Sequence, residues 1–501
     1  MIKKLKLNTI TSLILEIVKI ICGIILPRFI LKMYGSNVNG LVNSIANFLS
    51  VISFLELGVG AVIQSSLYKP LANKDNNEIS KIMVSANKFF SRIGTTLVIY
   101  IIALIFIYPL LSSSDFDFWY IASLIIAMGI DMVAQYYFGI TNRLLLSSDQ
   151  KGYIHYSVQI ITIIVNTVAC ILLINNNVSI QIVKFTTAFV YIIRPIILKI
   201  YVDRHYSIDY KITYTEEPIK QKWNGIAQHV ASVVLNQTDN IVLTVFSTLK
   251  NVSIYSVYFL VINGIKTLVM SLTSGIHAIY GELWAKNDKI KLLQFFELSE
   301  WAIHTGTVFL YGCTAMLIVP FVQIYTKDVI DTNYIQPVFA FLLTIAHAGH
   351  CLRLPYNMMI LAAGHYKETQ HNYIIASLLN ISISIIFVKI YGLIGVAIGT
   401  LVAMLYQTIW MAWYNSKNLL QRPYKDFIKQ LLVDIICFGL VLIWKDIFVE
   451  MYYLTELSYL YWIILAIKSV VIVIVIIAIV NIIFYRSRIE SCIKHLFKRT
   501  N

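Results

Sequence analysis

The first two long apolar stretches of this sequence contain ionisable side chains at positions where a lipid bilayer makes them costly. These residues are Glu16, Lys19, Arg28 and Glu56. A charged side chain at the bilayer centre costs about 2.5 to 3.5 kcal/mol on insertion scales, so the set would cost about 10 kcal/mol if it faced lipid. We therefore expect these residues to face a protein interior or a wet cavity, where cations bind anionic groups and carboxylates bind protons or sodium.

Lys19 and Arg28 are candidates for binding an anionic substrate. Lys19 follows Glu16 by three positions, which places both on one face of a helix. Two interpretations stay open for them: a self-neutralising pair that lowers the cost of burial, or a lysine that offers its charge to an anionic substrate. The guanidinium of Arg28 suits bidentate contact with phosphate, and the alternative is that it reaches the outer interface along its own stem.

Glu56, Asp131 and Asp239 are acids at membrane depth and are candidates for ion coupling. A proton or sodium site in a membrane needs such a carboxylate. The alternative is that these acids pair with Lys266 or Arg353, which lie deep in later apolar stretches. We predict that Lys266 and Arg353 join Lys19 and Arg28 in a cationic cavity.

Histidine and cysteine residues give no pattern typical of a metal or redox site. The six cysteines make no CxxC pair, so neither a disulfide framework nor a zinc site is expected. We expect no cofactor. The histidines of the apolar stretches are predicted to be hydrogen-bonded packing residues, with proton relay as the alternative; they are His155, His277, His304, His347 and His350.

Apolar stretches of about 20 residues, each ending in a polar turn, run through the chain and are the signal of membrane-spanning helices. Of the 501 residues, 58% are hydrophobic and 13% are charged, which is too apolar for a soluble protein of several domains. Fourteen stretches are predicted: 9–33, 38–66, 84–110, 117–142, 153–174, 178–201, 223–248, 252–284, 296–325, 335–363, 370–388, 393–414, 427–445 and 460–485.

The net charge of +14 is distributed as an orientation signal. If the N-terminus is cytoplasmic, the loops on the other side of the membrane hold few basic residues: Lys32, Lys250, Lys327, Lys389 and Lys445. Such asymmetry follows the positive-inside rule and predicts that both termini are cytoplasmic. The basic residues therefore indicate contacts with anionic lipid, and nucleic acid is not an expected partner.

The sequence contains a weak internal repeat. A shift of 217 positions aligns residues 5–68 with residues 222–285 without a gap, and a second echo has an offset of about 214. Duplicated halves are common in transporters, whose binding sites lie between the repeats. We predict an N-terminal six-helix bundle at 1–201, a cytoplasmic linker at 202–222, a second six-helix bundle at 223–415, and two further helices with a basic tail at 416–501.

Sequence motifs of membrane enzymes are missing from the chain. It contains no GxxxxGK[ST], HExxH or GxSxG pattern, so ATP hydrolysis, zinc proteolysis and serine hydrolysis lack their sequence requirements. The predicted external loops are also too short for a catalytic domain. We therefore expect a transporter, and a membrane polysaccharide polymerase is a weaker alternative.

Several segments resemble the polysaccharide repeat-unit flippases of the Wzx type. They are the first helix pair, the tract GVGAVIQSSLYKPLANKDNNEISKI that ends it, the SSDQKGY turn and the LNQTDN run. These flippases belong to the multidrug, oligosaccharidyl-lipid and polysaccharide exporter superfamily. The resemblance implies two pseudo-symmetric six-helix bundles around a central cavity, as an all-α integral membrane protein.

The resemblance also implies a function. The chain is expected to move undecaprenyl-pyrophosphate-linked oligosaccharide repeat units across the bacterial plasma membrane by alternating access, for capsule, exopolysaccharide or O-antigen-like polysaccharide. A proton or sodium gradient is a possible energy source. An ion-coupled extruder of drugs or other cations with the same fold is the main alternative, although it would require an acidic cavity.

Overall fold

The computed structural model describes residues 2–56, 59–112, 116–219, 226–273, 275–447 and 457–498, and the regular elements in these ranges are all helices. Within these described ranges, twelve helical stretches are long and apolar enough to cross a membrane. The chain is therefore a multi-pass membrane protein, and the predicted all-α fold class is confirmed.

The fourteen predicted segments and the twelve helical stretches differ at two places. The first two predicted segments lie in one helical stretch, Lys6–Glu56, which is broken at Gly35, between the two predicted ranges. The seventh corresponds to α8, Ile226–Phe246, where the run LNQTDN makes the middle of the helix polar. Parts of three predicted ranges lie outside the described residues, namely 57–58 in 38–66, 223–225 in 223–248, and residue 274 in 252–284.

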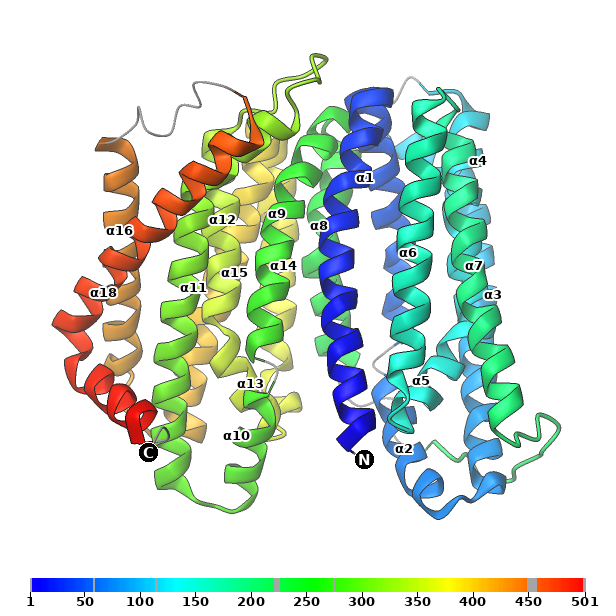
Figure 1. The fold of residues 1–501 in the computed structure, drawn as a ribbon, viewed down its shortest axis with the longest axis horizontal. Coiled ribbons are helices and arrows are strands. Elements are labelled where there is room, and N and C mark those ends of the chain that lie inside the picture. Colours follow the sequence, from blue (N-terminus) through cyan, green and yellow to red (C-terminus); the bar gives the residue numbers. More distant parts are fainter. Residues whose placement is uncertain are drawn as a thin grey trace. The chain divides into compact units, whose positions relative to one another are not determined.

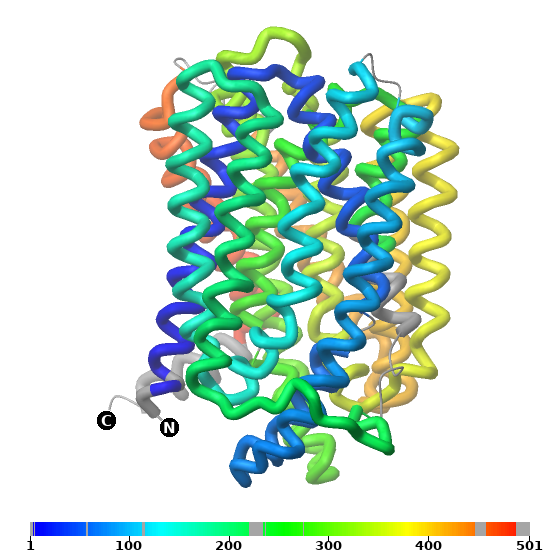
Figure 2. The backbone as a smooth tube through the Cα atoms, turned by 90° about the vertical axis from the view of Figure 1, so that its right-hand side faces the viewer, coloured from blue at the N-terminus to red at the C-terminus, as the bar shows by residue number. Residues whose placement is uncertain are grey.

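The chain divides into two compact units, Met1–Ser253 and Ile254–Asn501. The first unit contains α1 Ile2–Ser50, η1 Val51–Glu56, α2 Val59–Asn73, α3 Asn76–Leu111, α4 Phe118–Ala134, η2 Gln135–Gly139, α5 Ile140–Ser148, α6 Gly152–Asn175, α7 Ile180–His205 and α8. The start of α9, Leu249–Thr273, also belongs to it. Figure 2 shows α6 and α7 lying side by side along their length, as their contacts also indicate.

The second unit holds the rest of α9 and the helices after it (Figure 1). These are α10 Ile276–Ala285, α11 Lys289–Tyr325, α12 Pro337–Leu352, α13 Leu354–Ala362, α14 Tyr366–Tyr391, α15 Leu393–Tyr414, η3 Asn415–Leu419, α16 Lys425–Ile447 and α18 Tyr459–Lys498. The last two helices pack on α11 through an apolar cluster that includes Val308, Val441 and Val473. Both lie in the range 416–501, and their separation from a six-helix bundle stays a prediction.

Element boundaries confirm the internal repeat. Helices α2 and α10 begin at Val59 and Ile276, which are 217 positions apart. Helices α5 and α13 are both nine residues long and begin 214 positions apart, as α6 and α14 also do. These are the two offsets that the sequence predicts, so both halves break their helices at equivalent places.

Helix capping follows the same repeat. Asp75 caps α3 by accepting a hydrogen bond from the backbone N–H of Glu78 at 3.0 Å, and Asp288 caps α11 in the same way through Lys291 at 3.1 Å. Aspartate is a preferred N-cap residue because its carboxylate satisfies a backbone donor that has no partner within the helix. Helices α3 and α11 therefore begin with the same capping chemistry.

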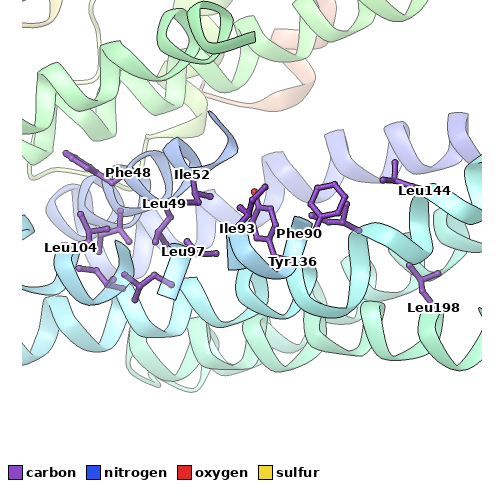
Figure 3. Close-up of a cluster of buried hydrophobic side chains, with 14 of the residues drawn as sticks. Phe48, Leu49, Ile52, Phe90, Ile93, Leu97, Leu104, Tyr136, Leu144 and Leu198 are labelled. Atoms are coloured by element: carbon purple, nitrogen blue, oxygen red, sulfur yellow. The ribbon is translucent and has the colours of Figure 1, made fainter. Parts of the chain in front are cut away.

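The core of the first unit lies between α1, η1, α3, η2, α5 and α7. Figure 3 shows its labelled side chains, from α1 and η1 (Phe48, Leu49, Ile52), α3 (Phe90, Ile93, Leu97, Leu104), η2 (Tyr136), α5 (Leu144) and α7 (Leu198). A polar seam crosses this core, where Tyr108 donates to Ser44 at 2.7 Å and Ser44 contacts Thr244 at 2.7 Å. Helix α1 itself is broken at Gly35, whose φ of 76° favours glycine.

The predicted linker folds back onto α3 as far as it is described. The carboxylate of Glu217 accepts a hydrogen bond from Ser85, and the backbone N–H of Asp209 donates to the hydroxyl of Ser80 at 3.0 Å. Ile219 is buried in the core of the first unit. The predicted boundaries of the two bundles stay a prediction.

Candidate functional site

Lys19 and Glu16 form the ion pair that their spacing allows. The ammonium nitrogen of Lys19 lies 2.8 Å from the Glu16 carboxylate, and both side chains are more than a third exposed. The self-neutralising interpretation therefore describes this structure, and a contact between Lys19 and a substrate stays a prediction. Arg28, on the same helix, is half-buried.

The predicted coupling acids have their own partners in the first unit. Glu56 ends η1 and accepts a hydrogen bond from the Tyr136 hydroxyl at 2.7 Å. Asp131 lies in α4 within electrostatic reach of Arg194 and Lys184 on α7. The alternative pairing of these acids with Lys266 or Arg353 stays a prediction.

Asp239 lies in the polar run of α8 and is 2% exposed. A carboxylate this deeply buried requires interaction partners, because an isolated charge is strongly disfavoured in a low-dielectric interior. Its role in ion coupling stays a prediction.

Arg353 occupies a break between two helices of the second unit. It lies between the two helices, as the C-cap residue of α12 and the N-cap residue of α13. Pro355, near the start of α13, favours the beginning of a helix there. The side chain is 6% exposed. One guanidinium N–H donates to Nδ1 of His350 at 2.9 Å, which makes that ring nitrogen an acceptor. Arg353 is therefore a deeply buried cation held by a neutral imidazole.

Lys266 and His347 lie close to this arginine. Lys266 on α9 is 8% exposed and interacts electrostatically with Arg353. The ring of His347 is buried against Phe259, with 5.6 Å between the ring centroids, and the Lys266 ammonium lies 5.7 Å from the centroid of the same Phe259 ring. The structure thus brings together two of the four predicted cations.

This cluster contains polar atoms without partners. Among the described residues, Nε of Arg353 and both ring nitrogens of His347 have no hydrogen bond. Leaving a buried donor unsatisfied costs about 1 to 3 kcal/mol, and more for a charged group. An oxygen-rich anion is the complement of such a set. We refer to Lys266, His347, His350 and Arg353 as the cationic cluster.

A second buried polar group in the second unit was missed by the sequence analysis. Glu300 on α11 accepts from one guanidinium nitrogen of Arg422 at 2.7 Å and also from the other nitrogen. The Tyr356 hydroxyl donates to Glu300 at 2.5 Å, and His304 lies 3.3 Å from that hydroxyl and 2.6 Å from Asp434 on α16. Each of these residues is at most 6% exposed.

One signal in the sequence pointed to this group. Glu300 and His304 are four residues apart in the apolar stretch 296–325, so they share a helix face. The sequence analysis predicted that His304 is hydrogen-bonded, which the structure confirms, and it named proton relay as the alternative to a packing role. Arg422 and Asp434 lie in or near a different predicted segment, and nothing local connects them with Glu300.

An apolar pocket of about 500 Å³ lies between α11, α12, α15 and α16. Its walls are mostly aliphatic and aromatic, with Leu352, Leu405 and Phe438 among the lining residues, and Asp434 at one side. A pocket of this volume and composition accommodates a hydrocarbon segment rather than a sugar.

Asp149, in the SSDQKGY turn, ties the start of α1 to the end of α7. It lies 2.8 Å from the Lys151 ammonium and 3.6 Å from that of Lys4, and it accepts a hydrogen bond from Tyr206 at 2.6 Å. Burial opposes ionisation of this carboxyl, but the hydrogen bonds from Lys151 and Tyr206 and the two ammonium charges outweigh burial and lower its pKa.

We expect the Asp149 carboxylate to contribute pH-dependent stability. Because the folded pKa lies below the unfolded one, the contribution is complete above the unfolded pKa and is lost as the pH falls through the folded pKa, that is, below about pH 4. Asp149→Asn should lower the free energy of unfolding by about 1 kcal/mol at neutral pH. Unfolding of both proteins in detergent at several pH values should show the difference vanishing in acid, whereas a constant difference would contradict this origin.

Neither a family model nor a curated protein matches the sequence. Among solved structures, the lipid II flippase MurJ in an inward closed conformation is similar over 96% of this chain and 99% of its own, with 17% identity and a TM-score of 0.69. An inward-facing MATE-family multidrug transporter of the MOP superfamily is similar over 80% of this chain and 95% of its own, with 12% identity and a TM-score of 0.64. A eukaryotic MATE transporter is similar over 85% of this chain and 97% of its own, with 11% identity and a TM-score of 0.56.

The chain therefore has the fold of the MOP-superfamily transporters, which is the superfamily that the sequence resemblance implies. At these identities the likeness shows the fold alone. The Wzx type stays a prediction.

Proposed function

We propose that this protein is a flippase of the bacterial plasma membrane, with both termini cytoplasmic, that moves an undecaprenyl-pyrophosphate-linked oligosaccharide repeat unit to the outer leaflet by alternating access. The observation that carries the proposal is the cationic cluster. It combines the buried basic side chains of Lys266 and Arg353 with Nε of Arg353 and the two ring nitrogens of His347, which have no hydrogen bond among the described residues.

A pyrophosphate fits the chemistry of this cluster. The planar guanidinium of Arg353 has donors spaced for two oxygens of one phosphate, and Lys266 supplies a second charge within electrostatic reach. His347 offers a further ring N–H as donor. The free energy of leaving these groups unsatisfied falls when the anion binds, so the site favours the loaded state.

The apolar pocket supports the proposal that the substrate carries a polyprenyl chain. The pocket is bounded on one side by helix α16, and its lining is almost entirely hydrocarbon. Because a polyprenyl chain in the bilayer is already surrounded by hydrocarbon, the pocket would hold it through van der Waals packing. A chain segment in this pocket would lie in the same unit as the cationic cluster, so one unit holds a candidate site for each end of the lipid carrier.

Transbilayer movement in proteoliposomes tests the proposal. We expect the full-length protein to move a lipid-linked oligosaccharide diphosphate, and Arg353→Ala to reduce the rate about 10- to 100-fold, because a charge-assisted bidentate contact contributes about 1.5 to 3 kcal/mol. Arg353→Lys keeps the charge but not the fork, so it should recover only part of the rate. Arg92→Ala, which removes an exposed cation on α3, is the matched control.

Two outcomes would contradict the proposal. The first is an Arg353→Ala protein that remains folded and moves the substrate at the wild-type rate. The second is a wild-type protein that moves no lipid-linked diphosphate but exports a hydrophobic cation. The second outcome would favour the extruder alternative, for which Asp131 and the buried Asp239 are candidate cation ligands.

A further inference from the structure

The buried polar group of the second unit forms a continuous row. It runs from Arg422, between η3 and α16, through Glu300 and Tyr356 to His304 and then to Asp434. Asp434 lies nine residues into α16, about 14 Å along its axis, and it borders the apolar pocket. The row therefore connects the end of a helix with the lining of a pocket. We call these five residues the buried row.

Stability alone does not account for so many ionisable groups in one place. Replacing a buried ion pair with well-packed apolar residues is often neutral or stabilising, because desolvation offsets most of the attraction between the charges. Each member of the buried row is at most 6% exposed, so each carries this desolvation penalty. A function that needs titratable groups explains their presence better than packing does.

The hydrogen-bond directions in the buried row specify the protonation state of His304. The Tyr356 hydroxyl has one proton, which it donates to Glu300 at 2.5 Å. Its oxygen is then an acceptor for Nε2–H of His304 at 3.3 Å, while Nδ1–H of the same ring donates to Asp434 at 2.6 Å. Every hydrogen bond in the row is satisfied only when the imidazole carries both protons.

Charge balance gives the same answer. With an imidazolium, the two carboxylates of Glu300 and Asp434 are balanced by Arg422 and His304, and the buried row is neutral. Loss of one proton leaves a net negative charge in a low-dielectric interior, which is costly. The titratable and charged groups that face His304 are Asp434, Tyr356, Glu300 and Arg422, and around these lie Tyr280, Asp426 and Cys437.

We propose that the buried row is a proton-binding site whose occupancy controls the docking of α16 on α11. Release of the proton begins when Nε2–H of His304 passes to the Tyr356 oxygen while the proton of Tyr356 passes to Oε1 of Glu300. The products are a neutral imidazole, an intact phenol and a protonated Glu300, and the Glu300 proton then passes to a solvent water molecule that reaches the Arg422 end of the row. Once the imidazole is neutral, Asp434 loses its charged partner and α16 is held less firmly.

This site responds to pH, and because α16 lines the apolar pocket, it links protonation to the shape of that pocket. The inference goes beyond the proposed function, since it names no substrate. Its test also uses none, so failure here leaves the flippase proposal untouched and the reverse holds as well.

Backbone hydrogen exchange of α16 in the full-length protein, reconstituted in lipid nanodiscs, tests the inference. After correction for the intrinsic pH dependence of exchange, we expect the α16 amides to exchange at least about tenfold faster at about pH 8.5 than at about pH 6. His304→Gln should abolish this pH dependence, because its side-chain amide still donates to Asp434 but does not titrate. His371→Gln, an exposed histidine of α14, should retain it.

A purely structural role gives a different result. In that case His304→Gln would speed exchange by the same factor at every pH and the wild-type protein would show no pH dependence, which would overturn the inference. The inference would also be overturned if His304→Gln kept the wild-type pH dependence. If His304→Gln does not fold, Asp434→Asn serves in its place, because it keeps a hydrogen-bond acceptor for His304 and removes the charge that binds the imidazolium.

Discussion

Gly40→Leu should lower the free energy of unfolding of this protein by about 3 kcal/mol, because overpacking against rigid backbone cannot be relieved by a rotamer change. A Cβ at Gly40 would lie 1.9 Å from the carbonyl oxygen of Leu249 and 2.7 Å from its carbonyl carbon. Hydrogen bonds on both sides hold α1 at this distance, from Asn39 to Ser253 at 2.7 Å and between Ser44 and Thr244 at 2.7 Å. The extra carbons would force the two segments apart and break both hydrogen bonds.

Gly23→Leu is the matched control for this prediction. Gly23 lies in the same helix, and a Cβ there meets nothing within 4 Å. Leucine is a better helix former than glycine by up to about 1 kcal/mol, so the control should be neutral or slightly stabilising. Thermal unfolding in detergent compares the two variants. Equal unfolding midpoints for Gly40→Leu and the wild-type protein would contradict a close contact between Gly40 and the backbone of Leu249.

The fold was predictable from sequence because it depends on local and periodic features. Apolar length identifies membrane helices, and the offsets of 217 and 214 identify the duplicated halves, whose helices begin at those spacings. The prediction of a helix at 223–248 also holds, although that segment has a polar centre. The run LNQTDN lowers the hydropathy of α8, although the helix is continuous from Ile226 to Phe246.

The candidate site was predictable only in part. Depth within an apolar stretch correctly predicts that Lys266 and Arg353 are buried, and spacing correctly predicts that Lys19 can pair with Glu16. Sequence does not predict which helices meet. Glu300 and Arg422 are 122 positions apart, and their pairing depends on how α11 packs beside the segment before α16.

Histidine residues illustrate the same limit. A histidine in a membrane helix is usually a hydrogen-bonded packing residue, and His304 is hydrogen-bonded as expected. Its neighbours, however, decide what else it does. His304 lies between a carboxylate and a tyrosine hydroxyl, whereas His347 packs on an aromatic ring with both nitrogens free of hydrogen bonds among the described residues.

Removal of Arg422 should have a larger effect than removal of any exposed charge. Arg422→Leu leaves the carboxylate of Glu300 buried, with Tyr356 as its remaining donor, and breaking a buried pair in this way costs about 3 to 5 kcal/mol. Glu300→Leu leaves the guanidinium unpaired and should cost a similar amount. The double variant Glu300→Leu/Arg422→Leu removes both desolvated charges, so we expect it to be more stable than either single variant.

The double-mutant cycle separates pairing from packing. If Glu300 and Arg422 contribute mainly through apolar contacts of their side chains, such as that of Arg422 with the Phe296 ring, the two single effects will add and the coupling energy will be near zero. If charge pairing dominates, the coupling energy will account for most of either single effect. An exposed ion pair between Glu282, on α10, and Lys286, directly after it, is the control for a pair without burial. Lys286→Leu should leave the unfolding midpoint unchanged.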